Sequence, residues 1–210
     1  MRTALVAACV LSMVSASASA APVITFAEGT GGNAAGTTVF QNFDDLAAGS
    51  SIGTSANVYA TDSSKGATPA FGSTGNFAAV LGGGTYSVSF NASSIFSFVL
   101  GSLDRYNQLT LSFSDGTSQV YNGGQIIGGG SYPAGDQSSP DSNGLVTFTA
   151  AGNQFLTGAI FRSDTNSFEF DNLAIAAVPE PATWAFMTLG LGLVAVTLRR
   201  RKTNGIVAFN

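Results

Sequence analysis

Five oxygen-bearing side chains, in two segments far apart along the chain, have the chemistry of a calcium site. They are Asp44, Asp45, Glu169, Asp171 and Asn172. Calcium prefers carboxylate and amide oxygens, so these side chains would suit a structural ion if the first and last strands of the domain pair. A wet strand face that ends in a turn explains the same residues without an ion. The sequence leaves both interpretations open.

The backbone that positions this acidic segment is predicted to be irregular. Phe168 and Phe170 share one face of an extended strand, whereas Leu173 and Ile175 share the opposite one. If all four side chains enter the core, a β-bulge must fall near Asp171 and Asn172, because a bulge re-aims the side chains that follow it.

A second set of residues has the chemistry of a sugar site. It consists of three tyrosines near turn signals and two neighbouring amides, namely Tyr106, Asn107, Tyr121, Asn122 and Tyr132. Exposed aromatic rings can stack on sugars while amides bond the hydroxyl groups. The alternative is that Tyr106 and Tyr121 cap the core, with their hydroxyl groups at its rim.

Composition argues against most catalytic chemistry. The chain has no histidine, and its one cysteine is Cys9, near the N-terminus. A histidine base, a cysteine nucleophile in the body of the chain and a zinc site of the usual kind are therefore excluded. We expect no enzyme activity and no cofactor other than the possible structural calcium.

The charge balance also limits the partners. Between residues 22 and 178 there are three cations, Lys65, Arg105 and Arg162, against eleven acidic residues. Because such a surface repels phosphate backbones, we expect no nucleic-acid binding.

The elements that must hold these residues are strands. Apolar and polar residues alternate in 86–90, 109–113 and 146–149, and the apolar run 95–100 indicates a central strand. Clusters of glycine, including Gly82–Gly84 and Gly128–Gly130, are typical of hairpin loops. We predict an all-β fold, a β-sandwich of the jelly-roll type, followed by a single C-terminal transmembrane helix.

Both ends of the chain have the pattern of export signals. Residues 1–20 combine Arg2, an apolar run and Ala-Ser-Ala, which is typical of a signal peptide cut by signal peptidase. The domain would then span residues 21–177. Residues 182–198 carry no charge and are long enough for a membrane helix, and the cations behind them favour the cytoplasmic side.

The motif between the domain and this apolar run resembles a known sorting signal. It consists of Pro179, Glu180, Pro181 and Trp184, with Arg199, Arg200 and Arg201 at the far end. In this order, the residues resemble the PEP-CTERM sorting signal over 178–202, with a short tail at 203–210. The resemblance implies processing by an exosortase-type membrane enzyme in a Gram-negative bacterium. It also implies an inner-membrane-anchored precursor and a mature form on the cell surface or outside the cell.

The domain also resembles other exosortase-dependent surface proteins, in stretches such as Phe43–Leu46, Leu100–Asn107 and Ser167–Leu173. That resemblance implies a non-catalytic structural or adhesive role associated with extracellular polysaccharide or biofilm. The alternative is a calcium-dependent, lectin-like carbohydrate-binding module. Carbohydrate-binding sandwiches with a similar Asp-Asn ending near their last strand often carry a structural calcium ion.

Overall fold

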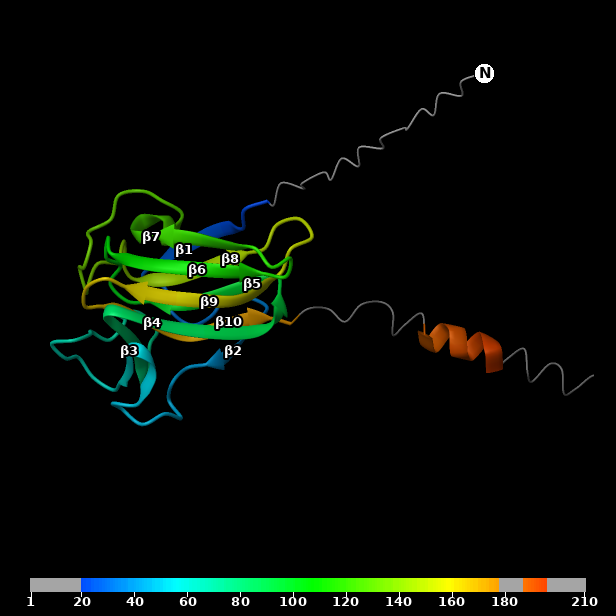
Figure 1. Cartoon of the computed structure of the whole chain (residues 1–210), viewed down its shortest axis with the longest axis horizontal. Coiled ribbons are helices and arrows are strands. Elements are labelled where there is room, and N and C mark those ends of the chain that lie inside the picture. Colours follow the sequence, from blue (N-terminus) through cyan, green and yellow to red (C-terminus); the bar gives the residue numbers. More distant parts are fainter. Residues whose placement is uncertain (1–19, 178–186, 196–210) are drawn as a thin grey trace, which may run out of the picture.

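The computed structural model describes residues 20–177 and 187–195 of the 210-residue chain, and the first of these ranges is built from antiparallel strands (Figure 1). The prediction of an all-β domain is confirmed. The strands are β1 (Val23–Glu28), β2 (Thr37–Gln41), β3 (Ser51–Tyr59), β4 (Phe77–Ser93), β5 (Ile95–Leu100), β6 (Asn107–Phe113), β7 (Ser118–Asn122), β8 (Gly144–Thr149), β9 (Leu156–Ser163) and β10 (Phe168–Ala176). A short 3₁₀ helix, η1 (Gly123–Ile127), follows β7, where the sequence predicts only a turn.

The strands form one continuous sheet that curls into two facing layers. One layer has the order β1-β8-β5-β10-β2, and the other has the order β4-β9-β6-β7. Strand β4 joins the two, because its first residues pair with β10 and its later residues pair with β9. Strand β3 pairs with the opposite edge of β4, since Val80 has Phe168 of β10 as one partner and Ala56 of β3 as the other.

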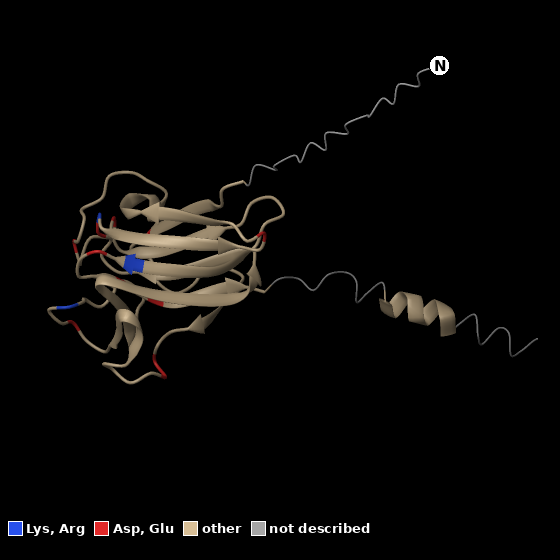
Figure 2. Cartoon of the chain, viewed as in Figure 1, with Lys and Arg blue, Asp and Glu red and all other residues tan. Residues whose placement is uncertain are grey.

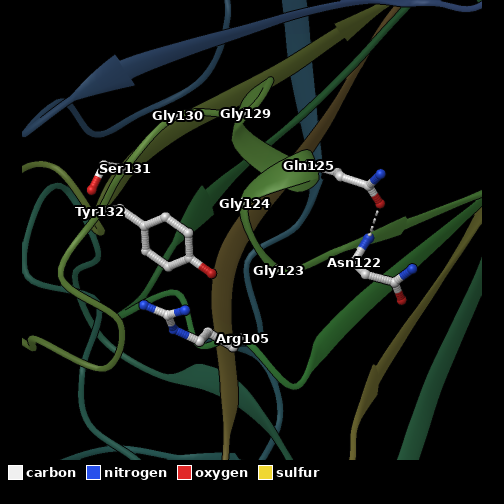
Figure 3. A pocket seen from close by; sticks show the side chains of 9 residues that line it. All are labelled: Arg105, Asn122, Gly123, Gly124, Gln125, Gly129, Gly130, Ser131 and Tyr132. Atoms are coloured by element: carbon white, nitrogen blue, oxygen red, sulfur yellow. Dashed lines mark hydrogen bonds between the residues drawn. The ribbon is translucent and has the colours of Figure 1, made fainter.

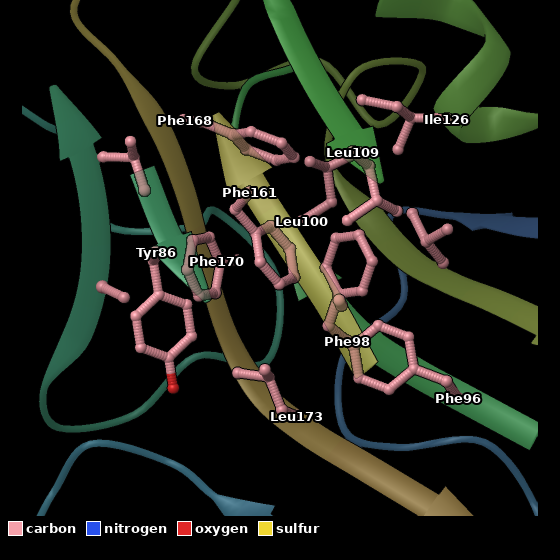
Figure 4. Packing of buried hydrophobic residues seen from close by; sticks show 14 of the residues in the cluster. Tyr86, Phe96, Phe98, Leu100, Leu109, Ile126, Phe161, Phe168, Phe170 and Leu173 are labelled. Carbon is pink, nitrogen blue, oxygen red and sulfur yellow. The ribbon is translucent and has the colours of Figure 1, made fainter. Parts of the chain in front are cut away.

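Aromatic rings fill the space between the layers (Figure 4). Phe161 of β9 stacks on Phe170 of β10, with their ring centroids 3.9 Å apart. The same ring makes T-shaped contacts with Phe98 of β5 and with Phe168, with ring centroids 5.0 Å and 5.3 Å apart. Since β9 belongs to one layer and β5 and β10 to the other, these contacts hold the two layers together.

The prediction of a hairpin loop at Gly82–Gly84 is wrong. These residues lie inside the 17-residue strand β4, at the point where it changes partners. Gly83 has a φ of 74°, which favours glycine. A Cβ atom on Gly84 would lie 2.6 Å from the carbonyl oxygen of Thr54 in β3, so the close approach of these strands also requires glycine.

Two loops of small residues cover the outer face of the first layer. The amide of Ala34 donates to Ser97 Oγ of β5, and Ser73 Oγ donates to Asp171 of β10. The loops also touch each other, since a Cβ atom on Gly31 would lie 2.1 Å from the Cα atom of Gly72. For this reason β5 and much of β10 are buried on both faces.

The predicted bulge is confirmed, whereas the predicted membrane helix is described only in part. The pairing of β10 shifts register between Asp171 and Ala174, and Asn172 has a φ of 50°. Residues 187–195 are helical. None of the helices in the two described ranges is long and apolar enough to cross a membrane, and the rest of the predicted span 182–198 lies outside them. The membrane helix therefore stays a prediction.

The central position of Phe161 generates a stability prediction. Replacing Phe161 by alanine leaves a cavity at the junction of the two layers, and we expect a loss of about 3–5 kcal/mol in the free energy of unfolding. Ile160 is the matched control, because it precedes Phe161 on β9 and is 37% exposed. Urea unfolding of the domain checks both variants. Equal losses for Phe161→Ala and Ile160→Ala would contradict this account of the core.

Candidate functional site

A polar cavity of about 280 Å³ lies on the outer side of β10 and brings together residues that are far apart in sequence. Two of the predicted site residues, Tyr106 and Glu169, line it. Asp104, which the sequence analysis did not select, lines it as well. The wall is completed by Ser63, Ser64, Lys65, Gly66, Ser102, Gly135, Gln137, Asn166 and Ser167.

Glu169 is buried beside this cavity, with 3% of its surface exposed. Its Oε1 atom accepts hydrogen bonds from the amide of Ala67 at 3.1 Å and from Ser167 Oγ. Its Oε2 atom is buried and has no hydrogen-bond partner among the described residues. Gly101 makes room for the side chain, because a Cβ atom there would lie 2.7 Å from Glu169 Cβ.

Burial dominates the electrostatics of Glu169. Loss of solvent raises the pKa of its carboxyl group, the hydrogen bonds from Ser167 and Ala67 oppose that change, and the nearby charge of Asp104 adds to it. In the described part of the chain, the one ion pair joins Arg162 to Asp164. Glu169 therefore has no cation within salt-bridge distance in that part.

Asp104 and Tyr106 form the other side of the cavity. The hydroxyl group of Tyr106 lies 2.7 Å from Asp104 Oδ2 and 2.7 Å from the carbonyl oxygen of Asn166. Burial raises the pKa of Asp104, and burial together with the Asp104 carboxyl group raises the pKa of Tyr106. The hydroxyl group of Tyr106 is thus hydrogen-bonded to the protein, as expected of a ring that caps the core with its hydroxyl group at the rim.

Asp44 and Asp171, predicted as calcium ligands, approach each other through the pairing of β2 with β10. Their oxygens already accept protein hydrogen bonds. Asp171 accepts from Ser73 Oγ at 2.6 Å and from the amide of Asn172 at 2.7 Å. Asp44 accepts from Asn42 Nδ2 and from the amide of Asn76, both at 2.8 Å.

No metal cluster is evident around these carboxylates. Asp45 is exposed, and the side-chain amide of Asn172 donates to the carbonyl oxygen of Gly72 at 3.2 Å. Within residues 20–177 and 187–195, no group of three or more acidic, histidine or cysteine side chains is arranged to hold a metal ion. The calcium site stays a prediction without an assembled ligand set.

The residues predicted to bind sugars separate into an exposed and a buried group. Tyr132 and Asn122 line an open hollow of about 640 Å³ beside η1, together with Arg105 (Figure 3). The ring of Tyr132 packs against the backbone of η1, since a Cβ atom on Gly124 would lie 2.9 Å from it. Gln125 Oε1 accepts from the amide of Asn122 at 2.9 Å and holds the start of η1.

Tyr121 and Asn107 lie inside the domain. Tyr121 is 5% exposed and packs on Phe148 with ring centroids 5.3 Å apart, and burial raises its pKa to about 12. Asn107 is buried and donates to Ser163 Oγ and to the carbonyl oxygen of Ser167. Neither side chain is available on the surface that a sugar site requires.

Sequence reasoning missed one part of each of these two sites. The turn at 63–67 covers Glu169, and Arg105 joins the hollow beside η1. Nothing in Ser63-Ser64-Lys65-Gly66 signals a contact with a strand one hundred residues later. The Leu103–Asn107 segment carries the only available signal, because polar residues gather there directly after a buried strand.

The comparison with known families identifies the segment after β10. The family described as the PEP-CTERM protein-sorting motif matches residues 177–202, which begin directly after Ala176, the last residue of β10. No curated protein matches the chain. The predicted motif residues Pro179, Glu180, Pro181, Trp184 and Arg199–Arg201 lie within the match but outside the described residues, as does the predicted signal peptide up to residue 19.

Asp171 generates a prediction about pH. Burial raises its pKa from 3.8 to about 6, against the hydrogen bonds from Ser73 and Asn172 and with a small contribution from Asp44. Because the folded-state pKa is raised, this group stabilises the fold fully below pH 3.8, and that stability is lost as the pH rises through 6. A difference of about two pKa units corresponds to about 3 kcal/mol.

We therefore expect Asp171→Asn to flatten the fall in the free energy of unfolding between pH 3 and pH 7 by about 3 kcal/mol. Urea unfolding at several pH values, with chelator present, measures the profile. Asp141→Asn, at an exposed carboxyl group, is the control. The pKa values of Asp104 and Glu169 are also raised, so these two groups contribute a fall in stability with rising pH in both variants. A profile of Asp171→Asn that is parallel to the wild type would overturn the assignment.

Proposed function

We propose that this chain is a non-catalytic structural or adhesive protein of the cell surface, delivered by an exosortase-type system and associated with extracellular polysaccharide. The sorting motif implies an exported protein that is processed by an exosortase-type membrane enzyme. One observation carries the proposal: the folded domain ends at Ala176 and the matched motif begins at residue 177. The β-domain is therefore the part that the sorting system delivers.

The form of the domain supports a role through shape and surface. We assign it to the jelly-roll type, because β1-β8-β5-β10-β2 and β3-β4-β9-β6-β7 form the two facing layers and the chain passes repeatedly between them. The eleven acidic residues between 22 and 178 favour a solvated surface outside the cell.

The carboxyl groups beside the polar cavity also favour a role without catalysis. A general acid must contact the group that it protonates. Glu169 Oε2 is covered by protein, and Asp104 is bound to Tyr106. Neither carboxyl group is presented to a substrate in the manner that glycoside hydrolysis requires.

A second candidate function is carbohydrate binding in the hollow beside η1. The observation that favours it is that Tyr132 and Arg105 lie close together on one open surface, which Asn122 also lines (Figure 3). An aromatic ring, an amide and a guanidinium group can together contact the face and the hydroxyl groups of an acidic sugar. This candidate includes the proposal that sugar binding depends on calcium, which is its less specific part.

The sorting role is tested by changing the motif. In a host with the sorting enzyme, we expect the triple variant Pro179→Ala, Glu180→Ala and Pro181→Ala to accumulate as a membrane-associated precursor. The wild type is expected to lose a C-terminal segment that includes Arg199–Lys202. Cell fractionation and intact-mass analysis measure both. Pro133→Ala, in a loop of the domain, is the matched control, and equal processing of all three proteins would refute the proposed function.

The second candidate is tested by co-sedimentation with the polysaccharide of the producing cell, with calcium and with chelator. If the hollow binds sugar, Tyr132→Ala weakens binding about tenfold through the loss of ring stacking. Tyr59→Ala is the control, because that ring stacks on Phe77 and lies outside the hollow. Saturable binding that is unchanged in Tyr132→Ala would place the sugar elsewhere, and no binding at all would leave the structural role.

A further inference from the structure

An apolar groove of about 500 Å³ lies where the chain leaves the domain toward the sorting motif. It is formed by the outer side of β2, the end of β4 and the end of β10. The residues that line it are Thr38, Phe40, Asn91, Ala92, Ile175 and the alanines at 176 and 177. None of them is charged.

Phe40 gives this groove an exposed aromatic side chain in a fixed position. It is 39% exposed, and no other aromatic residue in the described ranges is classed as exposed. Its ring packs against Phe90 with ring centroids 5.7 Å apart, and Phe90 stacks on Phe96 of the core with ring centroids 5.1 Å apart. A ring that is held from behind and open in front is typical of the aromatic anchors of protein interfaces.

The length of the connection determines what comes close to the groove. Pro179 is three residues beyond Ala176, which lines the groove and ends β10. Since an extended chain spans at most about 3.6 Å per residue, Pro179 lies within about 11 Å of Ala176 and Pro181 within about 18 Å. Any enzyme that takes hold of Pro179–Pro181 must therefore come up against this end of the domain.

The distribution of charge favours a close contact at this end. In Figure 2 most of the acidic and basic segments lie toward the left end of the domain, whereas β10 finishes at the right end. Charged residues are depleted from the centres of protein interfaces, because they must be desolvated on binding.

From these observations we infer that the groove around Phe40 is a docking surface for the exosortase-type membrane enzyme, which binds it at the same time as the adjacent motif. The inference rests on the proposed sorting function. The motif supplies the processed segment, and the groove supplies a second contact that raises the effective concentration of the motif at the enzyme. The processing enzyme would then recognise folded domain and tail together.

The test uses the full chain in a host that carries the sorting enzyme, with pulse-chase measurement of precursor and mature protein. We expect Phe40→Ser to slow processing about tenfold, the effect typical of losing an interface anchor. Val120→Ser is the matched control, because Val120 is 47% exposed on β7 and lies outside the groove. Thermal unfolding of both purified variants confirms that they remain folded.

A spacer separates docking from other effects of the substitution. Twelve Gly and Ser residues inserted after Ala177 extend the mean reach of the connection by about 20 Å, which lowers the effective concentration of the motif at an enzyme docked on the groove. Phe40→Ser is expected to have a clearly smaller effect in that background. A tenfold effect that persists with the spacer would overturn the inference.

Other occupants of the groove give different results. Loss of a wild-type dimer in Phe40→Ser, measured by light scattering, would assign the groove to a second copy of the chain. Loss of binding to phosphatidylglycerol vesicles would assign it to the lipid surface. If the triple motif variant is processed normally, the proposed function itself fails; if that variant is blocked but Phe40→Ser is processed at the wild-type rate, only the docking inference fails.

Discussion

The stack of Phe161 on Phe170 is the contact on which the rest of the domain depends. It joins β9 of one layer to β10 of the other, and rings from β4 and β5 surround it. The one cysteine of the chain is Cys9, within the predicted signal peptide, so the domain contains no disulfide. Burial of these rings must therefore supply most of the free energy that holds the two layers together.

This packing leaves β10 with an unusual second face. Its inner side chains are aromatic, whereas its outer side carries Glu169 and Asp171, both buried under loops rich in small residues. Covering two carboxyl groups costs free energy, which the hydrogen bonds from Ser73, Ala67 and Ser167 offset only in part. Glycines such as Gly31 and Gly72 let the loops lie flat against one another and close this cover.

Local patterns predicted the features that depend on neighbouring residues. Alternation identified the strands around Tyr86, Leu111 and Val146, and the phase change after Phe170 identified the bulge at Asn172. Contacts between distant segments had no such signal. The glycines of β4 look like a turn until β3 is seen to approach them, and the choice for Tyr121 between a sugar site and a cap of the core stays open until Phe148 is placed against it. The cavity beside Glu169 joins four separate segments, so only the folded chain reveals it.

The place of β10 in the sheet makes the fold depend on the last residues of the domain. This strand pairs with β2, β4 and β5, yet it is the last strand of the domain. The sheet cannot close without the residues up to 176, because the contacts of β10 connect distant parts of the chain. The match to the sorting motif begins at residue 177, so the strand that completes the sheet and the sorting segment adjoin in the chain. The completion of the fold and the start of the sorting segment therefore lie within a few residues of each other.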